Sequence, residues 1–185
     1  MKNIIFLAPP SAGKGTQGEM LVKDYGYTLI SIGELLRNAI ANGSKYAEII
    51  EYNQSNGILV PDDITIEVLR EKLDITEKYI LDGFPRSIDQ AKKLENILKE
   101  LNRTDYFAIY LDISREESLK RASGRRTCEG CGKVYNIHYA KLTPKIEDVC
   151  DDCGNKLGKR NDQNLEVDIK RFDTFAELMI PILEY

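Results

Sequence analysis

The chain has 185 residues, of which 42% are hydrophobic and 30% are charged, and its formal net charge is −4. This length suits one main domain with room for a small insertion, and no run approaches the roughly 20 apolar residues that a membrane span requires. The negative net charge argues against a nucleic-acid-binding protein, which needs a strong positive field. The apolar run near the N-terminus lacks the length and cleavage region of a signal peptide, so we expect a buried strand there and a cytoplasmic protein.

Short apolar runs alternate with helical patterns along the chain. They cover residues 3–8, 27–30, 79–81 and 106–111, and the last run is the longest and most β-like. Ser87 can cap a helix in which apolar residues from Ile88 to Leu101 recur every three or four positions. This alternation predicts an α/β fold with a doubly wound parallel sheet of four buried strands.

Two segments interrupt the alternation. Residues 31–60 are helical and polar, with Gly43 and Gly57 as breakers, whereas residues 124–161 are rich in Cys, Gly and Lys and contain no long apolar run. We expect both to be insertions at the carboxyl edge of the sheet, where ligands bind in open α/β folds.

A segment of small residues with one lysine follows the first apolar run and leads into a helical pattern. A bound phosphate needs backbone N–H groups, a helix N-terminus and a cation, and here Lys14 supplies the cation and Thr16 a hydroxyl for Mg²⁺. The strict GxxxxGK[ST] pattern fails at Ala8 and directly after the lysine, so the loop alone leaves an ordinary strand-to-helix turn as an alternative. The candidate ATP-binding residues of the loop are Ser11, Ala12, Gly13, Lys14, Gly15 and Thr16.

Four cysteines form two CxxC pairs, Cys128 with Cys131 and Cys150 with Cys153, separated by 18 residues. In a chain without an export signal this spacing favours a closed, structural Zn²⁺ site over disulfides, although iron and cobalt stay open as alternatives. His138 lies between the pairs and is expected to be a spectator.

A zinc knuckle can also bind nucleic acid. The basic residues that flank these cysteines fit a clamp over a triphosphate better; they are Arg121, Arg125, Arg126, Lys159, Arg160 and Arg171.

Three motifs together resemble the adenylate kinase family, in the same order and at the same spacing along the whole chain. They are Gly-Lys-Gly-Thr-Gln from residue 13, Leu-Asp-Gly-Phe-Pro-Arg from residue 81 and Gly-Arg-Arg from residue 124. The long cysteine-bearing lid is closer to the bacterial members than to short-lid UMP/CMP kinases. The resemblance implies a P-loop NTPase-type kinase domain over residues 1–185, with a nucleoside monophosphate (NMP) binding insertion at 31–60 and a zinc-ribbon-like lid at 124–161.

The same resemblance implies a monomeric enzyme that transfers a phosphoryl group reversibly between Mg-ATP and AMP. ATP and AMP would be its substrates, Mg²⁺ and structural Zn²⁺ its cofactors, and neither nucleic acid nor membrane a partner. Two alternatives stay open: a UMP/CMP-type monophosphate kinase, and a nucleotide-binding sensor that has lost turnover.

On the AMP side, the resemblance implies that Arg37 and Arg86 hold the phosphate and that Gln90 reads the adenine edge. The other expected AMP residues are Ile32, Ile58, Leu59, Val60, Gly83, Phe84, Pro85, Arg160 and Arg171.

On the ATP side, Arg121 would lie against the adenine and Arg125 on the phosphates, with Val134 and Tyr135 as walls. Asp82 would orient the waters of Mg²⁺. The implied catalytic residues are Lys14, Arg86, Arg125, Arg160 and Arg171.

The chain departs from the family pattern at several positions. Ala8 and Ser11 stand where glycine is usual, which predicts weaker ATP binding or a reshaped loop, and Ile32 replaces a threonine near the adenine. Asp162 matches the first of two paired acidic residues, but Gln163 replaces the second. In the family, about another strand and helix normally follow the segment that corresponds to residues 180–185 of this chain.

Overall fold

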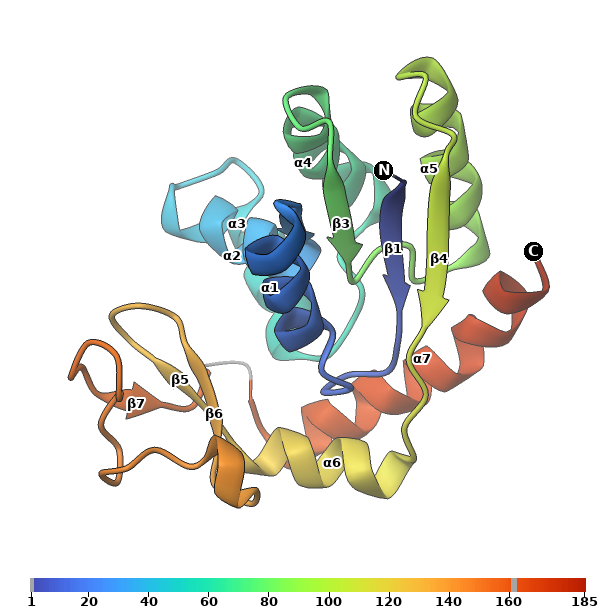
Figure 1. Ribbon diagram of the computed structural model, residues 1–185. Helices are drawn as coiled ribbons and strands as arrows, with labels where there is room; N and C mark the ends of the chain where they lie inside the picture. The colour runs from blue at the N-terminus through green and yellow to red at the C-terminus, as the bar shows by residue number, and fades with distance from the viewer. Residues whose placement is uncertain (1, 161–162) are drawn as a thin grey trace.

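The computed structural model describes residues 2–160 and 163–185 (Figure 1). Within them, the main sheet has four parallel strands in the order β2-β3-β1-β4. Their bounds are β1 Asn3–Leu7, β2 Thr28–Ser31, β3 Tyr79–Asp82 and β4 Tyr106–Tyr110. The parallel α/β sheet expected from the alternating pattern is therefore confirmed.

Helices cover both faces of this sheet. On one face, Ile5, Ile30 and Leu81 belong to a large apolar cluster that also holds side chains from α2, α3, α4, α5 and α7. On the other face, Ile4, Phe6 and Ile80 form a smaller cluster to which α1 contributes Leu21. The helices are α1 Lys14–Tyr25, α2 Ile32–Ala41, α3 Ala47–Ser55, α4 Asp62–Asp74, α5 Ile88–Glu100, α6 Arg115–Gly124 and α7 Leu165–Glu184.

The predicted cap of α5 is confirmed. Ser87 Oγ accepts a hydrogen bond from the Gln90 N–H, which satisfies one of the donors that a helix N-terminus leaves unpaired.

Strand β4 is less buried than the sequence predicts. It lies at the edge of the sheet, and on it Phe107 is 55% exposed and Tyr110 is 40% exposed. The expectation of four buried strands is wrong for this strand. The apolar run of residues 106–111 indicates strand propensity, whereas the burial of the strand depends on which elements pack beside it.

A second, antiparallel sheet forms the lid, with β5 Arg125–Cys128 between β6 Val134–Asn136 and β7 Leu157–Gly158. A short 3₁₀ helix, η1 Ala140–Leu142, follows β6. The lid has its own small core of Cys128, Tyr135, Cys150 and Leu157. In Figure 1 it lies beyond α6, on the side toward which the strands of the main sheet point, so the carboxyl edge of the sheet faces the lid.

Among the described residues, no helix combines the length and the apolar character that crossing a membrane requires.

Candidate active site

The phosphate loop connects the end of β1 to the start of α1. It turns through Ser11 at φ 60° and Gly13 at φ 98°, both in the left-handed region. Glycine adopts this conformation freely, whereas the Cβ of Ser11 makes it cost about 1–2 kcal/mol. The loop keeps its left-handed turn at Ser11 in spite of this strain.

Lys14 folds back over this loop. Its Nζ donates to the carbonyl oxygens of Ala8 and Pro9, each at 3.0 Å, and lies 4.0 Å from Asp82 Oδ1 at the end of β3. Burial lowers the pKa of Lys14 to about 8; Asp82 opposes this shift, and Arg86 and Arg125 reinforce it. The structure thus brings Lys14, Arg86, Arg125 and Asp82 together around the loop, and their predicted roles stay predictions.

Arg86 follows Asp82 within one tight turn. Its Nε donates to the Gly83 carbonyl at 2.6 Å, and a Cβ on Gly83 would lie only 2.9 Å from the Arg86 guanidinium. The residue is exposed by surface area, but the protein atoms that surround its guanidinium remove part of its hydration, and this desolvation lowers its pKa. Asp82 raises this pKa and Arg171 of α7 lowers it, which places Arg171 in the same electrostatic cluster.

Gln90 is almost fully buried, with 2% of its surface exposed. Its Oε1 accepts from the Arg86 N–H at 2.8 Å and its Nε2 donates to Asp62 Oδ1 at 2.8 Å. It therefore ties the turn that carries Arg86 to the segment that begins α4. A role in reading adenine stays a prediction.

Several of the other residues predicted for AMP are apolar. Ile32, Val60 and Phe84 lie in the main apolar core, with at most 6% of their surface exposed, whereas Ile58 is 42% exposed. Arg37 on α2 is partly exposed, and one of its guanidinium nitrogens lies 3.4 Å from the Cβ position of Gly33. Its guanidinium has polar atoms that can contact a phosphate, and its role in holding AMP stays a prediction.

Arg171 joins α7 to the NMP segment, because its guanidinium donates to the Gln54 carbonyl at 2.9 Å. The backbone carbonyl of Arg160 accepts a hydrogen bond from the Gln163 N–H at 3.0 Å. The predicted catalytic role of the Arg160 side chain stays a prediction. Asp162 lies outside the described residues.

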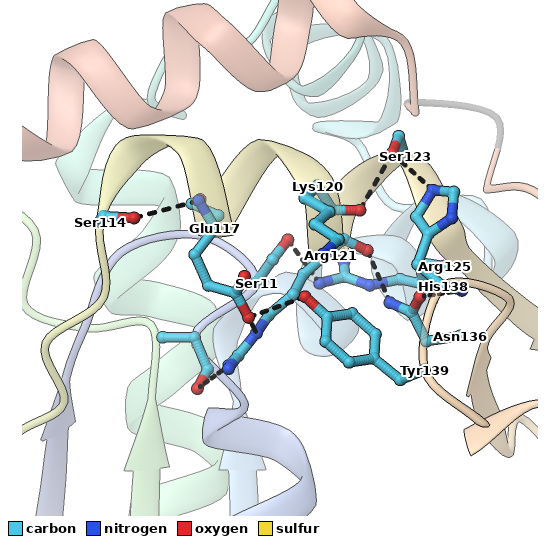
Figure 2. Close-up of polar contacts among 12 residues, drawn as sticks. Ser11, Ser114, Glu117, Lys120, Arg121, Ser123, Arg125, Asn136, His138 and Tyr139 are labelled. Atoms are coloured by element: carbon cyan, nitrogen blue, oxygen red, sulfur yellow. Dashed lines mark hydrogen bonds and ion pairs between the residues drawn. The ribbon is translucent and has the colours of Figure 1, made fainter. Parts of the chain in front are cut away.

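The base of the lid contacts the phosphate loop through two arginines (Figure 2). Arg125 donates to Ser11 Oγ at 2.8 Å, and Arg121 donates to the Ala12 carbonyl at 3.3 Å. Ser118 of α6 adds a hydrogen bond to the Pro10 carbonyl at 2.7 Å. Both predicted ATP-side arginines therefore reach the loop.

Sequence reasoning missed two residues at this junction. Glu117 pairs with Arg121 Nε at 2.7 Å and accepts from the Tyr139 hydroxyl at 2.7 Å, as Figure 2 shows. The Tyr139 hydrogen bond, followed by that of Arg121, lowers the pKa of Glu117. Its spacing of four residues from Arg121 is a sequence signal that could have found the ion pair.

The Tyr135 side chain lies in the core of the lid. It is 4% exposed, with its hydroxyl 3.5 Å from Cys150 Sγ, while Val134 is 40% exposed. The Tyr135 ring therefore packs beside the cysteine cluster. The role of both residues as walls of the ATP site stays a prediction.

The four cysteines converge in the lid, with all Sγ atoms within 4.8 Å of one another. Backbone N–H groups of Gly130 and Cys131 point to Cys128 Sγ, each at 3.4 Å. The Tyr135 hydroxyl, with further contributions from backbone N–H groups, lowers the pKa of Cys150 to about 6. Four sulfur atoms this close together, with N–H donors to Cys128, suit a tetrahedral, fully coordinated Zn²⁺, so this donor set fits the expected ion.

Comparison with known proteins agrees with this geometry. The sequence profile described as adenylate kinase matches residues 6–185. The chain belongs to the adenylate kinase family.

Among similar proteins, adenylate kinase from Thermosipho melanesiensis is 42% identical over 99% of this chain and 86% of its own length. The adenylate kinases of Thermosipho africanus and Archaeoglobus fulgidus are each 40% identical over 99% of this chain, covering 86% and 85% of their own lengths.

Proposed function

We propose that the protein is an adenylate kinase that transfers a phosphoryl group reversibly between Mg-ATP and AMP to form two ADP. The observation that supports this most directly is the convergence of Lys14, Arg86, Arg125 and Arg171 around a phosphate loop, in a chain of this family.

Phosphoryl transfer passes through a loose transition state and needs positioning and charge stabilisation rather than a covalent intermediate. In this proposal Lys14 and Arg125 neutralise the ATP phosphates, and Arg37 and Arg86 hold the AMP phosphate. Arg160 and Arg171 stabilise the phosphoryl group in transit. Arginine suits these positions because its planar guanidinium can bind two phosphate oxygens at once.

Two metal ions complete the proposal. Thr16 and Asp82 would hold Mg²⁺ and its waters, and this ion would neutralise charge that develops on the phosphates. The four cysteines would hold a structural Zn²⁺. We further propose that segments 31–60 and 124–161 close over the substrates and exclude water, which would otherwise compete as acceptor. The protein would act as a cytoplasmic monomer, without nucleic acid or membrane as a partner.

A coupled assay for ADP formation tests this function. Mg-ATP is offered with AMP, CMP, UMP or GMP, and AMP is expected to give the highest kcat/KM. Lys14→Met serves as the matched control, because it should fold normally and retain less than about a tenth of the wild-type kcat. Wild-type protein without turnover, or with CMP or UMP as the best acceptor, would contradict the proposal.

A further inference from the structure

The chain passes between the kinase body and the lid twice. It enters the lid where α6 ends at Gly124 and β5 begins at Arg125, and it returns ahead of α7, which begins at Leu165. Gln163 belongs to the returning segment, immediately before Asn164, whose side chain caps α7.

The Gln163 side chain reaches across to the entering segment. Its Nε2 donates to the Ala122 carbonyl at 2.7 Å and lies 3.4 Å from the Arg125 carbonyl, within hydrogen-bond reach. These partners are 41 and 38 residues away in the chain. The Gln163 side chain therefore links the two chain segments that connect the lid to the kinase body.

The chemistry of this contact requires a hydrogen-bond donor. Both partners are carbonyl oxygens, so the side chain has to present an N–H or O–H group to them, and a side-chain amide turned by 180° would oppose oxygen to oxygen. Gln163 Oε1 is buried and has no hydrogen-bond partner among the described residues, so the hydrogen bonds of this amide are those of Nε2. An acidic residue, as the family pattern leads one to expect here, would accept where this site needs a donor.

The entering segment has little room to shift. A Cβ on Gly124 would lie 2.2 Å from Asn136 Oδ1, and the Gly124 carbonyl accepts from the Ile137 N–H at 2.9 Å. The backbone of Arg125 is held between this packing and Gln163, while its guanidinium reaches Ser11 Oγ on the phosphate loop. A fixed backbone at Arg125 limits where its guanidinium can lie.

We propose that Gln163 is a positioning residue, which ties the two lid connections together and so sets the placement of Arg125 at the ATP phosphates. This inference rests on the proposed kinase activity. Gln163 itself does not touch the reacting atoms; its effect on the reaction passes through Arg125.

Two replacements of similar length separate the donor role from mere filling of space. Gln163→Met removes the donor, and Gln163→Glu replaces it with a charge that the two carbonyls repel. Asn102→Asp is the control for added charge, because Asn102 is exposed in the turn before β4, at the amino end of the strands. At about pH 8, we expect kcat/KM for ATP to fall about threefold in the Met variant and about tenfold or more in the Glu variant, with the control unchanged.

A pH profile adds a readout that a purely structural role would not change. A protonated carboxyl group can donate to the Ala122 carbonyl, so the ratio of Glu-variant to wild-type kcat/KM should rise toward that of the Met variant as the pH falls to about 4.5. Charged groups on the adjoining elements are Arg121 and Arg125 on the α6–β5 side and Glu166 and Asp168 in the first turn of α7. The charges of both signs on these elements partly offset one another, whereas burial beside two carbonyl oxygens disfavours the ionised carboxylate, so the recovery is expected above the ordinary pKa of glutamic acid.

Hydrogen exchange tests the contact of Gln163 with the entering segment without measuring enzyme activity. The Ile137 amide, which bonds to Gly124, should exchange faster in the Glu variant than in the wild type. Wild-type rates in both variants, or an equal loss in both at every pH, would overturn the role of Gln163. An inactive wild type would overturn the proposed function instead, and the exchange measurement would still decide the inference.

Discussion

The pKa of Lys14 links the phosphate loop to the pH dependence of ATP binding. The pKa is lowered from 10.5 to about 8, first because the ammonium is buried, so the nucleotide-free protein loses this charge as the pH rises through about 8. Nearby phosphates favour the charged form and raise the pKa again. Binding ATP above pH 8 therefore requires the uptake of a proton.

We therefore predict that the Kd for Mg-ATP is nearly constant below about pH 7 and rises as the pH increases through about 8, by up to about tenfold per unit. Calorimetric titrations in two buffers of different ionisation enthalpy would measure both the affinity and the proton uptake. Lys14→Met should bind weakly and show no such rise. A wild-type affinity that stays flat up to about pH 10 would show that Lys14 remains charged throughout.

A second residue-scale prediction concerns Gln90. Gln90→Leu leaves the Arg86 N–H and Asp62 without their present partner, and removes the group proposed to read adenine. We expect the KM for AMP to rise about tenfold and the preference among monophosphates to flatten by about 1–3 kcal/mol. Gln90→Glu is the matched comparison, because it keeps the acceptor for Arg86 N–H and loses the donor. An unchanged preference in both variants would mean that the base is read elsewhere.

At the scale of elements, the sequence predicts what local patterns determine. The apolar runs locate β1, β2, β3 and β4, and the period of three and four residues locates α5 with its cap at Ser87. The phosphate loop and the CxxC pairs are equally local, since their chemistry lies within a few residues. These features could be predicted without knowledge of the tertiary packing.

Features that depend on packing were not predictable in the same way. The exposure of β4 follows from its place at the sheet edge. The burial of the Tyr135 ring follows from its packing with Cys128 and Cys150 in the lid core. The Gln163 bridge joins residues 41 positions apart, a separation at which no periodic pattern operates. The hydrogen bond from Tyr139 to Glu117 is likewise a tertiary contact, between the lid and α6.

At the scale of the whole molecule, the two inserted segments differ in how they are held. The NMP segment shares the main core, to which it contributes Ile32, Leu36 and Ile50. The lid core is separate and consists of Cys128, Tyr135, Cys150 and Leu157. A cluster this small cannot offset the entropy of ordering the lid, so we expect the proposed metal ion to supply much of its folding free energy.

The last prediction follows from this difference. Removal of Zn²⁺ by a chelator, or the substitution Cys150→Ser, should release the lid amides to hydrogen exchange while the main sheet, α2 and α3 keep their protection. The thermal stability of the lid should fall and ATP handling should weaken, yet transfer should remain measurable at low temperature because the thiolates leave no coordination position for substrate. Elemental analysis of the reduced protein should give one zinc per chain. Protein that binds no metal, or that loses all activity on chelation while its lid amides stay protected, would rule out a structural ion, because in the second case the metal would act in the chemistry itself.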